Sequence, residues 1–208
     1  MAAITDESIA SNLHNYGVAA TPELCLAIQK YISVLLRWSE KIAITAITDP
    51  LQIVRLHFGE SMFGASAVPI KEGRLADVGT GAGFPGLPLK LLIPSLDLVL
   101  IESNAKKASF LSECIRELNI AGAEVYRGRF EDVEPAETPF DFVTARALGG
   151  YSDLVAWSQM RLTLVGSLVL WLGERDAMEM RKSSNLDWRA PVPIPGSDRR
   201  VLLIGNQT

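Results

Sequence analysis

A glycine-rich segment carries the strongest chemical signal in the sequence. It reads Leu75-Ala-Asp-Val-Gly-Thr-Gly-Ala-Gly-Phe-Pro-Gly86 and follows a short apolar run. Glycines after a strand let the backbone turn sharply and approach a ligand closely. Gly81, Gly83 and Gly86 also match the spacing GxGxxG, which is a weak signal when it stands alone. The segment therefore predicts a nucleoside-cofactor site at the end of a strand.

Two acidic residues narrow the class of cofactor. Asp77 precedes Gly79 by two residues, where an anion would repel a bound pyrophosphate but would not repel the cationic amino-acid end of S-adenosylmethionine. Glu102 ends the next apolar run, where a carboxylate can accept hydrogen bonds from both ribose hydroxyls of NAD or of S-adenosylmethionine. Together they favour the methyl donor. In the structural alternative, Asp77 only caps the loop and Glu102 is merely solvated.

The elements that must position these residues follow from hydrophobic periodicity. Short apolar runs predict strands at 75–78, 96–101, 123–126, 140–145, 167–172 and 201–204. Helical spacing lies between several of them, at 86–93, 106–118 and 151–162. Near-continuous apolar strands that alternate with helices indicate a parallel sheet covered on both faces. The expected fold class is α/β, with a doubly wound, mostly parallel, Rossmann-like sheet over residues 71–208.

The first seventy residues have a different pattern. Thr21-Pro22 and Asp49-Pro50 each place a capping side chain before a proline, which is a helix-start signal. Leu24, Ile28 and Ile32 then continue at helical spacing. We expect residues 1–70 to form a helical N-terminal extension that joins residues 71–208 in one compact unit.

Composition limits the class of protein. The 208 residues are 48% hydrophobic, and no apolar run approaches the roughly 18 residues that a membrane span needs. The first residues lack the basic and apolar regions of a signal peptide, and Cys25 and Cys114 form no CxxC pair. These features predict a soluble cytoplasmic protein without a metal site. The net charge of −4, with no strongly basic segment, does not favour nucleic acid, so any such partner requires a local basic patch.

The glycine-rich segment resembles the DxGxGxGxPGxPL signature of the bacterial 16S rRNA guanine-N7 methyltransferases, the RsmG or GidB family. Further similarity covers most of the chain. The segment from Trp38 to Pro50 is similar to W-N-K-x-x-N-L-T-x-x-x-D-P, and 57–61 matches H-x-x-D-S. Residues 102–111 correspond to D-S-x-x-K-R-x-x-F-L, and 140–147 match FDxVxxRA. The resemblance implies a methyltransferase of Rossmann-like fold that uses S-adenosylmethionine.

The same resemblance implies the cofactor contacts. Gly79 and Phe84 would line the methionine side, together with Thr80 and Gly81 of the same loop. Glu102 would hold the ribose, and Phe130 and Glu131 would flank the adenine. Arg146, at the end of a strand, would stand where donor and target meet. Without the resemblance, the favoured interpretation is that Phe130 is a core residue and that Glu131 and Arg146 form a surface pair.

The implied target is guanine 527 of 16S rRNA, either free or in a small-subunit assembly intermediate. Guanine N7 has a lone pair and no proton, so it can attack the methyl group directly, and catalysis rests on orientation. Arg146 is the candidate catalytic residue, through a hydrogen bond to guanine O6. We expect a monomer. The alternatives are an oxidoreductase that binds a nucleotide cofactor and a methyltransferase-like RNA-binding protein without turnover.

The sequence departs from the family pattern at several positions. Ala43 replaces Asn of N-L-T, Glu60 replaces Asp of H-x-x-D-S, and Leu172 replaces the Lys that precedes Gly173. The loss of that Lys concerns RNA affinity more than the cofactor. The remaining candidates for RNA contact are basic residues, for each of which a solvated surface position is the alternative: Lys106, Lys107, Arg129, Arg199 and Arg200.

Overall fold

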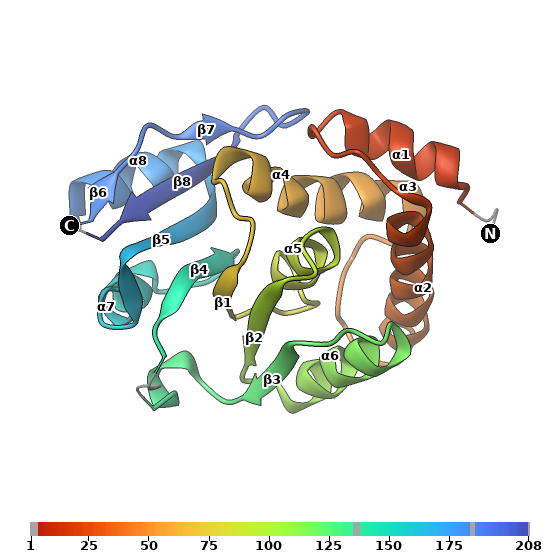
Figure 1. The fold of residues 1–208 in the computed structure, drawn as a ribbon, viewed down its shortest axis with the longest axis horizontal. Helices are drawn as coiled ribbons and strands as arrows, with labels where there is room; N and C mark the ends of the chain where they lie inside the picture. Colours follow the sequence, from red (N-terminus) through yellow and green to blue (C-terminus); the bar gives the residue numbers. More distant parts are fainter. Residues whose placement is uncertain (1–3, 135–137, 184–185, 208) are drawn as a thin grey trace.

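The computed structural model describes residues 4–134, 138–183 and 186–207. Its described strands form one eight-stranded sheet in the order β3-β2-β1-β4-β5-β8-β6, with β7 also paired to β8 (Figure 1). The central strands are β1 (Gly73–Val78), β2 (Leu96–Glu102), β3 (Ala123–Arg127), β4 (Phe140–Arg146) and β5 (Leu162–Gly173). The remaining strands are β6 (Asp187–Trp188), β7 (Val192–Pro193) and β8 (Arg200–Asn206).

The sheet has the topology of a doubly wound fold, as the sequence predicts. Strands β1 to β5 run parallel, and β8 is antiparallel to β5. The chain moves outward from β1 to β3 and then returns to place β4 on the other side of β1. At this reversal Val78 of β1 pairs with Ile101 of β2 and with Ala145 of β4. Ligands of open α/β sheets bind in such a crevice, outside the carboxyl ends of the strands.

Helices surround the sheet, and a first group of them precedes β1 in the chain (Figure 1). The first group consists of α1 (Asp6–His14), α2 (Pro22–Ser39), α3 (Pro50–Ile53), a π-helical turn η1 (Val54–Gly59) and α4 (Glu60–Ala67). The second group follows the strands: α5 (Gly86–Leu92), α6 (Ala105–Glu117), the 3₁₀ turn η2 (Phe130–Asp132), α7 (Tyr151–Gln159) and α8 (Glu174–Ser183). No described helix is long and apolar enough to cross a membrane.

Local sequence explains where the helices begin. The Thr21 side chain accepts a hydrogen bond from the Leu24 N–H, and Asp49 accepts one from the Gln52 N–H, each with proline at the next position. Such capping satisfies backbone donors that the first turn leaves free. Asn104 does the same for α6, with its Oδ1 accepting from the N–H groups of the next two lysines. The helix starts predicted at Thr21-Pro22 and Asp49-Pro50 are confirmed.

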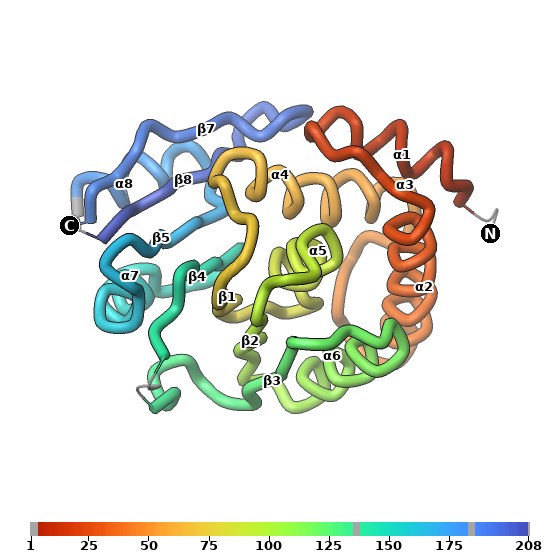
Figure 2. The backbone as a smooth tube through the Cα atoms, in the orientation of Figure 1, coloured from red at the N-terminus to blue at the C-terminus, as the bar shows by residue number. Residues whose placement is uncertain are grey.

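The N-terminal helices share a hydrophobic core with the sheet. Leu13, Ile28 and Leu35 are fully buried in the same cluster as Leu75 and Leu98 of the strands. Figure 2 shows the turn before β8 beside the loop that follows α1, and a Cβ on Gly196 would lie 4.0 Å from the Tyr16 hydroxyl. The division of the chain at residue 70 stays a prediction, and this core runs across it.

Candidate functional site

The glycine loop leaves the end of β1 in a conformation that favours glycine. Gly79, Gly81 and Gly83 have φ of 63°, 60° and 84°, in the left-handed region that side chains rarely adopt. A Cβ on Gly79 would lie only 2.5 Å from Cδ1 of Leu148, the residue that follows β4 by two positions. The backbone N–H groups of Gly79 and Thr80 donate to the Ile101 carbonyl at 3.0 and 3.3 Å. The loop is therefore fixed to the end of β2.

Asp77 fixes this loop through hydrogen bonds from its residues. Its carboxylate is fully buried and accepts hydrogen bonds from Thr80 Oγ1 at 2.5 Å, Gly86 N at 2.9 Å and Thr144 Oγ1 at 3.0 Å. Burial raises the pKa of Asp77 from 3.8 to about 6, against the opposing effect of these hydrogen bonds. The oxygens of Asp77 point inward to β4 and the loop, so any effect of its charge on a ligand acts through the loop and not by direct contact. The structural alternative, a cap of the loop, is the observed arrangement.

Glu102 joins the end of β2 to the same loop. The residue is 7% exposed, its Oε2 accepts from the Gly81 N–H at 2.9 Å, and its Oε1 accepts from the Asn104 N–H at 2.7 Å. It is therefore not a freely solvated side chain. A carboxylate has about four acceptor positions, so roughly two remain for a ligand. This is the chemistry that a pair of ribose hydroxyls requires.

A cleft of about 450 Å³ opens at the carboxyl ends of the strands. Its lining combines the glycine loop, the ends of β2 and β3 and the segment after β4: Gly79, Ile101, Ser103, Gly128, Arg129, Phe130, Glu131, Leu148 and Gly149. Three residues of the predicted cofactor set, Gly79, Phe130 and Glu131, therefore lie together. Three more members of that set belong to the loop or border it: Thr80, Gly81 and Glu102. The Thr80 hydroxyl donates to Asp77, and the Gly81 N–H donates to Glu102.

Phe130 and Glu131 both line this cleft. The half-buried Phe130 ring packs edge-on against Trp157, with 5.8 Å between the ring centroids. Glu131 Oε1 lies 3.0 Å from Arg129 Nη2, and this hydrogen bond is the main cause that lowers the pKa of Glu131. The alternative in which Glu131 pairs with Arg146 is wrong, since each has another partner. Arg129, proposed for RNA, lines the same cleft.

Phe84 lies deeper, on the side of the N-terminal helices. Its ring stacks on His57 with centroids 4.7 Å apart and an angle of 24°, and it contacts Tyr31 and Phe58 edge-on. His57 Nε2 is 3.1 Å from Thr45 Oγ1. Burial, with the nearby Arg146 charge, lowers the pKa of His57 to about 4. His57 is thus a neutral ring at pH 7, and its membership of the H-x-x-D-S match was the only sequence signal for it.

Arg146 is held by the N-terminal helices. Its Nη2 donates to the Leu56 carbonyl at 2.9 Å and lies 3.2 Å from Glu60 Oε2, while Glu60 Oε1 lies 2.6 Å from Arg200 Nη2. We call Glu60, Arg146 and Arg200 the charge cluster. The side chains of its members are 1%, 16% and 41% exposed, respectively. Burial raises the pKa of Glu60, and the two guanidinium groups oppose that rise. Sequence reasoning did not assign Glu60 to the site.

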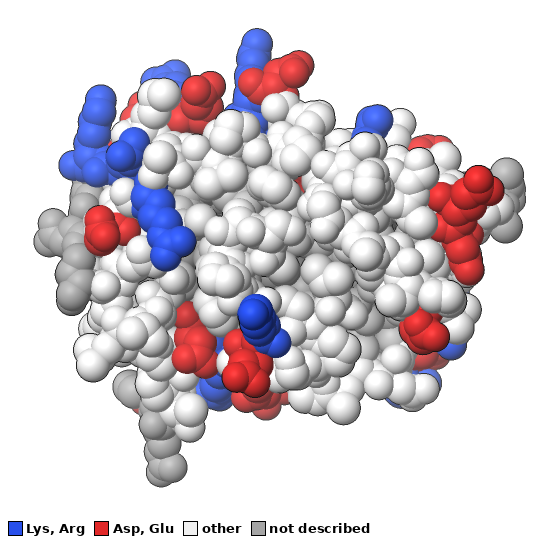
Figure 3. Space-filling model, turned by 45° about the horizontal axis from the view of Figure 1, so that its top comes forward, with Lys and Arg blue, Asp and Glu red and all other residues white. Residues whose placement is uncertain are grey.

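The basic residues proposed for RNA follow the carboxyl ends of the parallel strands and form two groups. Lys106 and Lys107 begin α6, close to Glu102 in sequence, and Lys106 is exposed. Arg199 is exposed just before β8, whereas Arg200 belongs to the charge cluster. Figure 3 shows Lys and Arg beside Asp and Glu around a wide area without charged side chains. Leu172, at the family's Lys position, is buried in β5 opposite Val201.

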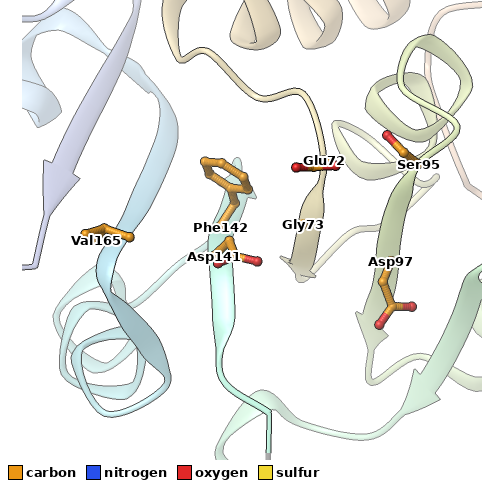
Figure 4. A pocket seen from close by; sticks show the side chains of 7 residues that line it. All are labelled: Glu72, Gly73, Ser95, Asp97, Asp141, Phe142 and Val165. Carbon is orange, nitrogen blue, oxygen red and sulfur yellow. The ribbon is translucent and has the colours of Figure 1, made fainter.

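A second cavity, of about 540 Å³, lies where the strands begin (Figure 4). Asp97 and Asp141 line it, but Asp97 Oδ2 lies 3.3 Å from Arg74 Nε, and Asp141 Oδ2 accepts from the Arg74 N–H at 2.8 Å. These contacts bind the starts of β1, β2 and β4 together. In the part of the chain that the structure describes, no group of three or more His, Cys, Asp or Glu could hold a metal ion.

Comparison with known proteins agrees with this arrangement. Residues 25–187 match the model of the family described as rRNA small subunit methyltransferase G, GidB. "Ribosomal RNA small subunit methyltransferase G" of Xanthomonas campestris pv. campestris is 37% identical over 81% of this chain and 80% of its own length. The protein of the same name from Streptococcus thermophilus is 33% identical over 85% of this chain and 80% of its own length.

Solved structures show the same fold at low sequence identity. A SAM dependent methyltransferase from Aquifex aeolicus has a TM-score of 0.63 and 14% identity, over 77% of this chain and 94% of its own. A ribosomal protein L11 methylase from Lactobacillus delbrueckii subsp. bulgaricus has a TM-score of 0.59 and 17% identity, over 74% and 80%. With the sheet order, the glycine loop and the family match in agreement, the chain belongs to the rRNA small subunit methyltransferase G family.

Proposed function

We propose that this protein transfers a methyl group from S-adenosylmethionine to N7 of guanine 527 of 16S rRNA. The observation that carries the proposal is the cleft at the strand ends, bordered by Glu102, in a chain that belongs to the methyltransferase G family. The substrate is 16S rRNA or a small-subunit assembly intermediate. The proposed place of action is the cytoplasm, and the proposed active form is a monomer.

The residues at the cleft fit the cofactor. Glu102 retains acceptor positions for the ribose hydroxyls beside the loop, and Phe130 offers a ring at the end of β3 against which an adenine can stack. Gly79, without a side chain, lets the backbone approach the methionine portion. Thr80 and Gly81 would contribute backbone to the same contact, and Glu131 a carboxylate beside the adenine. Phe84, whose buried ring packs against His57, would support the loop on the methionine side.

The reaction that this site would perform needs orientation more than proton transfer. When bound, S-adenosylmethionine supplies an electrophilic methyl group on a sulfonium. Guanine N7 attacks without losing a proton, so no general base is required, which agrees with a neutral, half-buried His57 of lowered pKa. The contribution of the protein is then to align acceptor, methyl and sulfur. Arg146 is the proposed catalytic residue, with an N–H donor directed at guanine O6.

The two basic groups suggest how RNA reaches the site. Lys106, Lys107 and Arg129 flank the cofactor side of the edge, and Arg199 and Arg200 the side of β4, β5 and β8. We propose that both groups contact phosphates around a guanine that is unstacked, since sequence-specific RNA readers mostly bind splayed or single-stranded bases. A protein of net charge −4 relies on such local contacts.

The experiment that tests the proposal is methyl transfer from labelled S-adenosylmethionine to small-subunit RNA, with naked 16S rRNA and purified subunits as separate substrates. Incorporation into either establishes turnover and shows which form is the substrate. Binding without incorporation would favour the non-catalytic, RNA-binding alternative. Calorimetric titration with S-adenosylmethionine and with NAD tests the oxidoreductase alternative, which requires the tighter binding to be that of NAD.

A further inference from the structure

Glu60 connects the N-terminal helices to the ends of three neighbouring strands. Its backbone carbonyl accepts a buried hydrogen bond from Trp171 Nε1 at 2.7 Å, near the end of β5. Its carboxylate lies 3.2 Å from Arg146 Nη2, at the end of β4, and 2.6 Å from Arg200 Nη2, at the start of β8. In the sheet register Arg146 pairs with Trp171, and Arg200 pairs with Gly173. One residue therefore fixes one edge of the candidate active site.

The position of Arg146 depends on the N-terminal segment. Nη2 donates to the Leu56 carbonyl and lies 3.2 Å from the Glu60 carboxylate, and these two partners come from η1 and from the first residue of α4. A π-helical turn is rare and often occurs at functional sites, because the wider turn redirects nearby groups. Arg146 Nη1 is buried and has no hydrogen-bond partner among the described residues. The described residues therefore leave the N–H donors of Nη1 without an acceptor.

The charges of the cluster also point to a ligand. One carboxylate stands between two guanidinium groups, so the cluster carries one positive charge in excess. A buried ion pair often contributes little net stability, because desolvation of the charges opposes their attraction. Stability alone is therefore a weak reason to bury Glu60. Its burial between two arginines at the ligand edge is better explained by orientation of both groups toward an electron-rich acceptor.

We propose that Glu60 is a positioning residue for methyl transfer to RNA. It holds Arg146 so that the buried Nη1 faces the oxygen of the target base, and it holds the half-exposed Arg200 toward a phosphate of the same RNA. Loss of the carboxylate frees both guanidinium groups to turn away. This inference rests on the proposed function and adds the residue that arranges the acceptor side, whereas the residues discussed above concern the cofactor side.

The test uses Glu60→Gln, which keeps the size of the side chain and removes its charge. We expect kcat/KM for methylation of the small-subunit substrate to fall at least about tenfold, as for other buried charge pairs that lose one partner. The dissociation constant for S-adenosylmethionine should stay within about twofold of wild type, because Glu60 does not line the cofactor cleft. Glu60→Asp, which restores a carboxylate, should recover most of the lost activity.

The matched control is Glu113→Gln, which removes the exposed Arg37–Glu113 pair with the same 2.6 Å separation and should leave methylation unchanged. The double variant Glu60→Gln/Arg200→Met has the same net charge as the native cluster. If charge balance alone mattered, it would regain activity, whereas positioning predicts that it stays as low as Glu60→Gln. It also supplies the measurement if Glu60→Gln does not fold.

Several results would overturn the inference. One is wild-type methylation by folded Glu60→Gln, or by the double variant, measured below the midpoint of thermal unfolding. Another is a loss of cofactor affinity as large as the loss of methylation. If wild-type protein transfers no methyl group at all, the proposed function fails and this inference with it. If the wild-type protein transfers the methyl group and the Glu60 variants transfer it equally well, the proposed function stands and this inference alone fails.

Discussion

Glu102 accepts a hydrogen bond from the Gly81 N–H at 2.9 Å, so one carboxylate ties the end of β2 to the turn of the glycine loop. Its other oxygen accepts from the Asn104 N–H at 2.7 Å, at the N-cap of α6. The carboxylate thus already has a fixed orientation and needs no rearrangement to meet a ligand. Preorganisation of this kind lowers the entropic cost of binding.

The Glu102→Ala variant should bind S-adenosylmethionine at least about tenfold more weakly, because hydrogen bonds to a charged acceptor are worth roughly 1.5–3 kcal/mol. Calorimetric titration measures the change, and circular dichroism establishes that the variant is folded. Asp97→Ala removes a carboxylate from the exposed start of the same strand and serves as the control. Equal affinities of wild type and Glu102→Ala would remove Glu102 from the cofactor site.

Gly79→Ala should impair both stability and cofactor binding. The residue has a φ of 63°, and the new Cβ would lie 2.5 Å from Leu148 Cδ1 in the wall of the cleft. We expect a loss of about 1 kcal/mol or more in the free energy of unfolding, measured by urea titration. Gly149→Ala is the control in the same wall, since its Cβ would meet nothing within 4 Å. Equal effects of the two substitutions would contradict the assigned role of Gly79.

Asp77 should make the protein less stable as pH rises. Burial raises its folded pKa from 3.8 to about 6, so between these values the folded state binds more protons than the unfolded state. The free energy of unfolding then falls as pH rises through this window, by up to about 3 kcal/mol. Asp77→Asn lacks this titration, so the difference between wild type and variant should shrink or change sign from pH 4 to pH 7. A difference independent of pH, measured by urea unfolding, would show that the pKa of Asp77 is not raised.

The Lys106→Ala/Lys107→Ala variant should methylate small-subunit RNA more slowly and bind free S-adenosylmethionine as wild type does. Each neutralised phosphate contributes about −0.7 to the log–log dependence of RNA affinity on salt for single strands, so we expect a shallow slope. Lys30→Ala/Lys71→Ala, which removes two exposed lysines that do not belong to α6, is the charge-matched control. A steep slope in wild type, or full methylation by the Lys106 and Lys107 variant, would place the RNA surface elsewhere.

Much of the fold could be predicted because its signals are local. The caps before Pro22 and Pro50, the apolar runs of β1 and β2, and the glycine loop each depend on a few adjacent residues. Two short strands, β6 and β7, were not predicted. A pair of residues carries no period, and the second includes a proline that removes a backbone donor.

The site was only partly predictable because its side-chain directions depend on tertiary packing. Asp77 is the next-to-last residue of β1 and Glu102 the last of β2, yet the first turns inward to Thr144 and the second toward the loop. The charge cluster joins Glu60 to two arginines that are distant in sequence, and no spacing rule connects them. The stacking of His57 on Phe84 likewise joins residues that are distant in sequence, so no local pattern predicts it.

The measurement that tests the central claim most directly is the position and chemistry of the methyl group that the protein adds. Small subunits whose 16S rRNA lacks this modification are incubated with the protein and labelled S-adenosylmethionine, and the RNA is digested and analysed by mass spectrometry. The account predicts one N7-methylguanine, at guanine 527, in amounts that fall strongly with Glu102→Ala and with Glu60→Gln. A methyl group on another atom or nucleotide, or no transfer to subunits or naked RNA by the folded wild-type protein, would contradict it.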